Sequence, residues 1–191
     1  MSLGDSRTQA GTYQPILAAD LAADSGGPTI VANGGLGWGT VVSTEGSRLP
    51  ICDPTRLAGL LALYTGPVDP SDVVISLGVN DGSATAVPSE ADFETAYLYI
   101  MDTVHAKWPG ARVWIAAGQW STQASDTVWN NMATWIANVQ AARSSFVSPG
   151  PDERTWFKPN VATYAIDGLH WSGTVAGATA AASEWRAVLG Y

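Results

Sequence analysis

Short apolar runs alternate along this chain with longer stretches of helical periodicity, and this alternation limits the fold more than any other feature. The clearest run is 72–77, where Val73, Val74 and Ile75 are adjacent, as in a strand buried on both faces. Further strands are predicted to end at Leu3 and to span 29–32, 112–117 and 161–165. Helices are predicted over 13–23, 57–64, 89–108, 127–143 and 174–189.

About five strands that alternate with helices predict an α/β protein, in which right-handed crossovers cover both faces of a parallel sheet. The expected architecture is a three-layer αβα sandwich with a central, mostly parallel five-stranded sheet. Residues 33–35 are expected to end the second strand, and the Pro- and Ser-rich segment 144–160 is expected to be a loop. The 191 residues suffice for one domain, predicted over 1–191.

Composition argues against several function classes. Net charge is −8, with no cluster of Lys or Arg, so we expect no nucleic-acid partner. No apolar run is long enough to predict a membrane span. No signal peptide is visible, so the default expectation is a cytoplasmic protein, or a secreted one if the natural chain begins before Met1. The single cysteine, Cys52, cannot form an internal disulfide, and no Cys/His cluster predicts a metal site.

Polar or glycine-rich segments follow the predicted strands, and in such sheets sites form beyond the carboxyl ends of the strands. The four segments are Gly4-Asp5-Ser6-Arg7-Thr8, the glycine loop 33–40, Gly78-Val79-Asn80-Asp81 and Asp167-Gly168-Leu169-His170. Together they contain the groups that a serine hydrolase needs. The Ser6 hydroxyl needs a base, which His170 can provide, and Asp167 can orient that base. The Ser6 backbone N–H, an N–H of the glycine loop and the Asn80 amide are candidate oxyanion donors.

Together these segments resemble the GDS, glycine, GxND and DxxH blocks of the SGNH (GDSL-like) hydrolase superfamily, in the same order and over residues 4–170. The resemblance implies a flavodoxin-like sandwich and a Ser-His-Asp hydrolase that needs neither metal nor cofactor. It also implies an oxyanion hole made by Ser6, Gly37 or a neighbour of Gly37, and Asn80. The N–H groups of Trp38 and Gly39 are the neighbouring candidates.

Other residues beside these motifs have plainer interpretations. Arg7 stands where the family often has an aliphatic residue, and pairing with a nearby acid is favoured over contact with a polar substrate group. Asp5 is expected to bond within its own turn, and Asp81 to support the loop of Asn80. Cys52 is interpreted as an inert thiol. His105 lies within a predicted helix and is given no catalytic role.

The chain has nine tryptophans, and three of them follow predicted strands. Trp38, Trp120 and Trp171 are candidate substrate-binding residues whose rings would stack on a sugar or pack an acyl chain; the alternative is that they only brace loops. Those on helix patterns are assigned to the core: Trp108, Trp129, Trp135 and Trp185.

The function predicted from these residues is a serine carboxylesterase that deacetylates a carbohydrate or another small acyl ester. A lipase or thioesterase acting on longer chains is the first alternative, and a glycan-binding module without catalysis is the second. A nucleotide-binding domain is the third, but the glycine loop lacks the G-x-G-x-x-G spacing. The expected partner is therefore a small-molecule or glycan ester.

Overall fold

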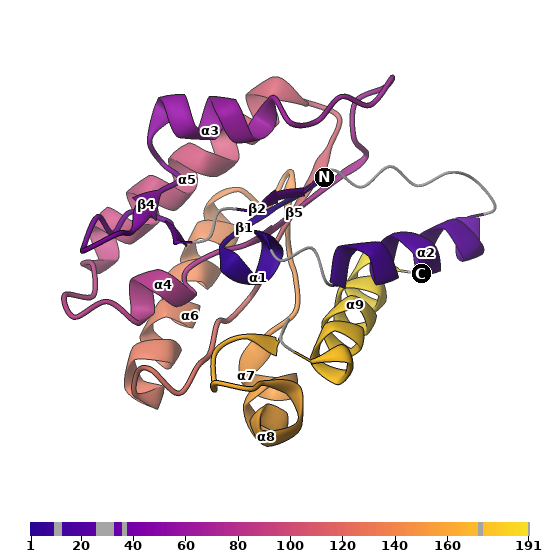
Figure 1. Cartoon of the computed structure of the whole chain (residues 1–191). Coiled ribbons are helices and arrows are strands. Elements are labelled where there is room, and N and C mark those ends of the chain that lie inside the picture. The colour runs from indigo at the N-terminus through magenta and orange to yellow at the C-terminus, as the bar shows by residue number, and fades with distance from the viewer. Residues whose placement is uncertain (10–12, 26–32, 36–37, 172–173, 191) are drawn as a thin grey trace.

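The computed structural model describes residues 1–9, 13–25, 33–35, 38–171 and 174–190, and it has the α/β architecture predicted (Figure 1). The strands are β1 (Ser2–Gly4), β2 (Asn33–Gly35), β3 (Gly39–Thr40), β4 (Leu49–Pro50), β5 (Asp72–Ser76), β6 (Arg112–Ile115) and β7 (Val147–Pro149). The helices are α1 (Ser6–Gln9), α2 (Tyr13–Ser25), α3 (Pro54–Leu61), α4 (Val79–Gly82), α5 (Glu90–Lys107), α6 (Asp126–Ala142), α7 (Glu153–Trp156), the 3-10 helix η1 (Lys158–Asn160), α8 (Val161–Tyr164) and α9 (Val175–Leu189).

Five strands form one parallel sheet in the order β2-β1-β5-β6-β7. In this register Leu3 of β1 is paired with Gly34 on one side and Ile75 on the other, and Ile75 is also paired with Ile115. Counted along the chain within this sheet, the order is 2-1-3-4-5, which is the flavodoxin-like order. Its switch point lies between β1 and β5, so the segments that follow these two strands meet there.

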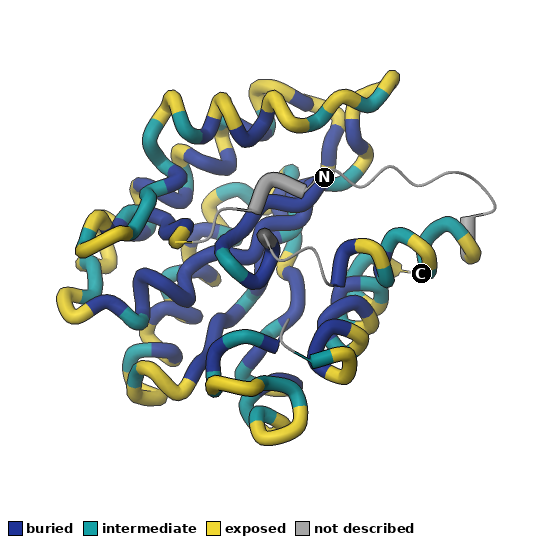
Figure 2. Tube along the Cα trace, viewed as in Figure 1, coloured by how far each residue is buried: buried dark blue, intermediate teal, exposed yellow. Residues whose placement is uncertain are grey.

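Helices cover both faces of the sheet. Figure 1 shows α2 and α9 on one side and α3, α5 and α6 on the other, and Figure 2 shows the buried strands between them. Leu3, Val73, Ile75 and Ile115 are completely buried. Apolar runs without alternation are what a sheet covered on both faces requires, because each face must pack against helices.

The helix boundaries follow local signals in the sequence. The Ser89 hydroxyl accepts a hydrogen bond from the Asp92 backbone N–H at 3.2 Å, so Ser89 is the N-cap of α5, as the Ser-x-x-Asp pattern predicts. Ser125 caps α6 in the same way, and Asp53 caps α3. Pro109 and Gly110 follow the end of α5.

The prediction for the fifth strand was wrong in position. Residues 161–165 form helix α8 and its C-cap, and the strand is β7, inside the segment 144–160 that was predicted as loop. Val147 of β7 is buried and in register with Val113, whereas 161–165 are exposed or half-buried. In a sheet covered on both faces, packing against the neighbouring strand favours a strand more than a long apolar run does. The three residues of β7 pair with β6 in this way.

The second strand of the sheet includes residues that were predicted to end it. The predicted span 29–32 is outside the described residues, while β2 occupies the three residues 33–35 that were expected to end it. A further pair of two-residue strands, β3 and β4, forms a small parallel sheet beside the main one. Among the described residues, no helix is long and apolar enough to cross a membrane.

Candidate active site

Ser6 is presented by a tight junction between β1 and α1. Gly4 is the last residue of β1, and a Cβ at this position would lie 2.7 Å from the Ser76 carbonyl oxygen of β5. Only glycine therefore allows β1 to run this close to β5 immediately before the serine. Asp5 then turns the chain: its buried Oδ1 accepts the Arg7 backbone N–H at 2.9 Å, as predicted for bonds within its own turn. Ser6 follows as the first, half-buried residue of α1.

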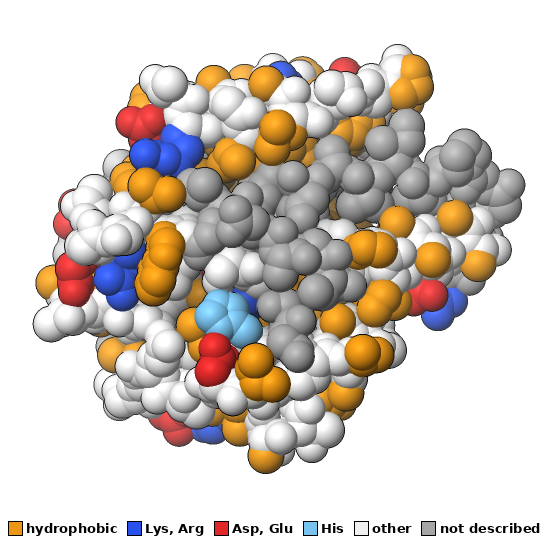
Figure 3. Space-filling view, in the orientation of Figure 1, with side chains coloured by type: hydrophobic (Ala, Val, Ile, Leu, Met, Phe, Trp, Pro, Cys, Tyr) orange, Lys and Arg blue, Asp and Glu red, His pale blue; other side chains and the backbone are white. Residues whose placement is uncertain are grey.

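His170 and Asp167 complete a continuous hydrogen-bonded chain with Ser6. The distance from Ser6 Oγ to His170 Nε2 is 2.9 Å, and that from His170 Nδ1 to Asp167 Oδ2 is 2.6 Å. Figure 3 shows this face, where a histidine side chain lies beside an acidic one at the surface. The structure therefore brings together the three residues that the sequence predicted as nucleophile, base and orienting acid.

Asp167 is held ionised by its own loop. Its Oδ1 accepts the backbone N–H groups of His170 at 2.7 Å and Leu169 at 2.9 Å, in addition to the ring bond at Oδ2. Partial burial acts to raise the pKa of this carboxyl, but the hydrogen bonds from His170 and Leu169 outweigh it and lower the pKa to about 2. Gly168, at φ 72°, supplies the left-handed turn that aims both N–H groups at the carboxylate.

Asn80 lies in α4, directly after β5, and is buried. Gly78 at φ 119° opens this helix, a backbone conformation that glycine adopts without strain. The Asn80 amide nitrogen donates one hydrogen bond to the Gly39 carbonyl oxygen at 2.9 Å, which leaves its second N–H for another acceptor. Gly37, the predicted backbone donor of the oxyanion hole, is outside the described residues, while its neighbours Trp38 and Gly39 are described.

Asp81 ties the loop of Asn80 to another segment of the chain. Its buried carboxylate accepts the backbone N–H groups of Val41, Val42 and Ser43 at 2.7–3.0 Å. Burial raises the pKa of Asp81, and the three N–H bonds oppose that rise. Asp81 thus anchors the segment that directly follows β3. Gly39 of β3 is the residue that accepts the hydrogen bond from Asn80.

Two charged residues near the site were missed by sequence reasoning. Arg48 donates from Nε to the Asn80 carbonyl oxygen at 2.8 Å and from Nη2 to that of Ser83 at 3.0 Å, so it bridges the two ends of α4. Glu153 is buried in α7 and forms a salt bridge with Arg7, which confirms the predicted pairing of Arg7 with an acid. Neither residue lies in a motif, and only the fold brings them to the site.

The three tryptophans that follow strands differ in exposure. Trp38 is 56% exposed, whereas Trp120 is 8% exposed and Trp171 only 1%. The Trp120 indole N–H donates to Asp126 at 3.1 Å, and the Trp171 ring packs edge-on against Tyr13 with centroids 5.2 Å apart. Trp120 and Trp171 therefore brace loops, the alternative considered for them, and Trp38 is the one of the three whose ring is open to solvent.

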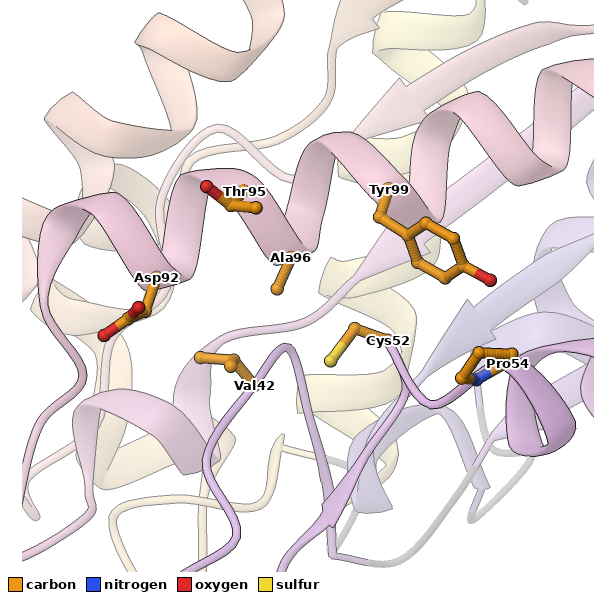
Figure 4. A pocket seen from close by; sticks show the side chains of 7 residues that line it. All are labelled: Val42, Cys52, Pro54, Asp92, Thr95, Ala96 and Tyr99. Atoms are coloured by element: carbon orange, nitrogen blue, oxygen red, sulfur yellow. The ribbon is translucent and has the colours of Figure 1, made fainter.

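The remaining predictions concern groups away from the site. Trp108, Trp129 and Trp185 are buried and Trp135 is partly buried, as predicted for core residues. Cys52 is half-buried, and burial raises the pKa of its thiol. It lines an open pocket of about 440 Å³ between α5 and the segment 42–54 (Figure 4). The pocket is lined by Val42, Cys52, Pro54, Asp92, Thr95, Ala96 and Tyr99. Within the described part of the chain, no group of three or more His, Cys, Asp or Glu side chains is arranged to hold a metal ion.

The fold is that of the SGNH (GDSL-like) hydrolases. The model of the GDSL-like lipase/acylhydrolase family matches residues 2–175. The chain therefore belongs to this family and is an ester-hydrolysing enzyme.

Solved structures share the fold at low sequence identity. A carbohydrate esterase family 3 protein from Talaromyces cellulolyticus has a TM-score of 0.70 at 16% identity, with 99% of this chain and 94% of that chain covered. An acetyl xylan esterase has a TM-score of 0.67 at 17% identity, with 98% and 100% covered. A family two carbohydrate esterase from Clostridium thermocellum, in complex with cellohexaose, has a TM-score of 0.65 at 18% identity; 98% of this chain and 62% of that one are covered. No curated protein matches the chain in sequence.

Proposed function

We propose that this enzyme is a serine esterase in which Ser6 is the nucleophile, His170 the general base and Asp167 the residue that orients the base. The observation that carries this proposal is the unbroken chain of hydrogen bonds, 2.9 Å from Ser6 Oγ to His170 Nε2 and 2.6 Å from His170 Nδ1 to Asp167 Oδ2. An ionised Asp167 carboxylate, whose pKa is lowered, accepts a hydrogen bond from the His170 Nδ1–H, and this tautomer leaves Nε2 free to accept the serine proton.

In this mechanism Ser6 Oγ attacks the ester carbonyl carbon while His170 Nε2 takes the hydroxyl proton. The carbonyl oxygen becomes an oxyanion, for which the Ser6 backbone N–H, the second Asn80 amide N–H and an N–H of the glycine loop are the proposed donors. His170 returns the proton to the leaving alcohol as the intermediate collapses to an acyl-serine. Water, activated by the same imidazole, then releases the acid and regenerates Ser6.

For the substrate we propose an acetylated carbohydrate. Trp38 supports this proposal. Its side chain is 56% exposed, and the next residue in the chain is Gly39, whose carbonyl oxygen accepts a hydrogen bond from the Asn80 amide. An exposed aromatic face beside an oxyanion donor is suited to stacking on a sugar ring while the ester reaches Ser6. Several proteins of similar fold are carbohydrate esterases, one of them an acetyl xylan esterase.

The serine mechanism is tested by p-nitrophenyl acetate hydrolysis with the wild type and Ser6→Ala, each checked for folding by circular dichroism. Ser71→Ala is the matched control, because Ser71 is an exposed serine that bonds only to neighbouring Asp72 among the side-chain interactions described. We expect Ser6→Ala to lose roughly 10³-fold or more in kcat while it stays folded. A wild type inert toward acetyl and longer acyl esters would instead favour a binding module on the same scaffold. A fully active Ser6→Ala protein would exclude Ser6 as the nucleophile.

A longer acyl chain is the second candidate substrate, and one observation favours it. Ile166 directly precedes Asp167 and is 74% exposed, so an apolar side chain flanks the triad. Release of acetate from acetylated oligosaccharides, compared with turnover of long-chain esters and acyl-CoA, separates the two. Trp38→Ala should raise KM for the oligosaccharide and leave p-nitrophenyl acetate turnover unchanged. Equal or better turnover of long-chain esters by the wild type, with sensitivity to Ile166→Ser, would replace the carbohydrate proposal.

A further inference from the structure

Arg7 directly follows Ser6 in α1, and its side chain is completely buried. The guanidinium contacts three other segments of the chain. It forms the salt bridge with Glu153, donates from Nε to the Leu169 carbonyl oxygen at 2.9 Å, and donates from Nη2 to the Trp120 carbonyl oxygen at 2.8 Å. The guanidinium carbon Cζ of Arg7 also lies 5.2 Å from the centre of the Phe157 ring.

A cation with no exposure to water is costly, and a chain keeps one only where fixed partners compensate for the lost hydration. Here all three guanidinium nitrogens are used, and two of them bind backbone carbonyls. Glu153 is also shared, because its Oε2 accepts the Trp120 backbone N–H at 3.1 Å. The planar fork of Arg7 therefore holds several loops in one mutual geometry.

The position of these loops relative to the triad is the important point. Arg7 is covalently adjacent to Ser6, and Leu169 is covalently adjacent to His170. The hydrogen bond from Arg7 Nε to the Leu169 carbonyl oxygen thus joins the side chain of the residue after the nucleophile to the peptide group before the base. A second bond, from the Thr122 backbone N–H to the Gly168 carbonyl oxygen at 3.0 Å, ties the same loop to the segment whose Trp120 carbonyl binds Arg7.

We propose that Arg7 is a positioning residue of this esterase: through its hydrogen bond to the Leu169 carbonyl it fixes the separation between Ser6 Oγ and His170 Nε2. This inference rests on the proposed roles of Ser6 and His170. It assigns no contact with substrate to Arg7, whose guanidinium is covered by Phe157, Trp171 and Glu153. The Asp167–His170 pair lies within one loop of four residues, so its geometry is set locally and does not need Arg7.

Removal of Arg7 alone leaves the Glu153 carboxylate buried without its cation, so that variant tests folding more than catalysis. The informative variant is the double change Arg7→Met/Glu153→Gln. It removes both charges together, fills the space of the arginine stem, and keeps an oxygen that can accept the Trp120 backbone N–H. Arg7→Lys is the conservative variant, since an ammonium keeps the salt bridge but cannot reach all three partners in the geometry of the fork. Val104→Ala, a buried change in α5, is the control for loss of stability alone.

Three measurements are made below the unfolding temperature of every variant: kcat and KM for p-nitrophenyl acetate, the rate at which a p-nitrophenyl phosphonate labels Ser6, and the far-downfield proton signal of the His170 Nδ1–H. In the double variant we expect kcat and the labelling rate to fall at least about tenfold, with little change in KM, because small misplacements of reacting groups cost large factors in rate. The downfield signal should persist, since Asp167 and His170 keep their own loop. Arg7→Lys should recover part of the lost rate, and Val104→Ala should match the wild type.

A folded double variant with the wild-type kcat and labelling rate would overturn the positioning role and leave Arg7 as a packing residue. A lost downfield signal would also overturn it, because the damage would then extend to the Asp167–His170 pair itself. Failure of the underlying mechanism is separately visible: an active Ser6→Ala protein removes the triad proposal whatever the Arg7 variants do.

Discussion

The Oγ atom of Ser6 and the Nε2 atom of His170 lie 2.9 Å apart, although 164 positions separate the two residues in the chain. This contact is made where β1 ends, and the flavodoxin-like strand order puts the end of β5, with Asn80, beside it. Asp167, by contrast, reaches His170 from within the same loop. The contact between Asp167 and His170 is therefore local, whereas the contact between Ser6 and His170 depends on the sheet. Single substitutions can test the two contributions separately.

Asp167→Asn should lower kcat for p-nitrophenyl acetate by roughly 10²–10⁴-fold without unfolding the protein. The asparagine amide can present N–H to His170 Nδ1, which favours the tautomer with its proton on Nε2, and that tautomer cannot accept the Ser6 proton. Asp69→Asn, in an exposed loop, is the matched control. Steady-state kinetics with circular dichroism check the result, and equal activities of the two variants would exclude Asp167 as the orienting acid.

Asn80→Ala should lower kcat by roughly 10²–10³-fold with little change in KM, because an oxyanion donor acts mainly on the transition state. Asn138→Ala is the control, since Asn138 is an exposed asparagine of α6 that bonds only to Glu90 and Glu94 among the interactions described. A rise in KM at constant kcat would instead assign Asn80 to ground-state binding.

Asp81→Ala should reduce the free energy of unfolding by about 3 kcal/mol, because three backbone N–H groups lose a charged acceptor. Asp53→Ala removes a carboxylate that accepts one backbone N–H, that of Arg56, and should cost about 1 kcal/mol. Urea unfolding of both variants measures the difference. If Asp81→Ala costs no more than Asp53→Ala, the anchoring of residues 41–43 by Asp81 is not important for stability.

Asp5 should make the wild type less stable as pH rises from about 4 to about 6. Burial, opposed by Arg7, raises the pKa of this carboxyl from 3.8 to about 6. Between these values the folded chain holds a proton that the unfolded chain has lost, so the free energy of unfolding falls as pH increases and is level above pH 6 with respect to this group. This pKa shift corresponds to a change of at most about 3 kcal/mol in the free energy of unfolding.

Asp5→Asn removes this titration, so the stability of the variant relative to the wild type should increase by up to that amount between pH 4 and pH 6. Urea unfolding at closely spaced pH values follows the difference, and Asp69→Asn should run parallel to the wild type. A difference between wild type and Asp5→Asn that does not change across this window would mean that Asp5 titrates at its ordinary pKa in the folded protein.

The parts of the protein that depend on neighbours in the chain were predictable from the sequence. The run Val73–Ile75 predicted a buried strand, Ser89 predicted the start of α5, and Asp167-x-x-His170 predicted a hydrogen-bonded pair within one loop. Ser6 and Asn80 were predicted to lie at one edge of the sheet because both follow parallel strands, and the strands before them, β1 and β5, are adjacent and parallel. These inferences need only periodicity, capping chemistry and the direction of the strands.

The sequence by itself therefore determined the class of fold, because its signals are local or repeat along an element. It also predicted the Ser6, Asn80, Asp167 and His170 set, from short motifs that occur in the order of the family's blocks. Only the tertiary structure decided that β7 and not 161–165 completes the sheet, that Trp120 and Trp171 are buried while Trp38 is exposed, and that Arg7 pairs with Glu153. The physical reason is that burial and long-range pairing depend on which distant residues fill the same space, and that choice is made by packing of the whole chain.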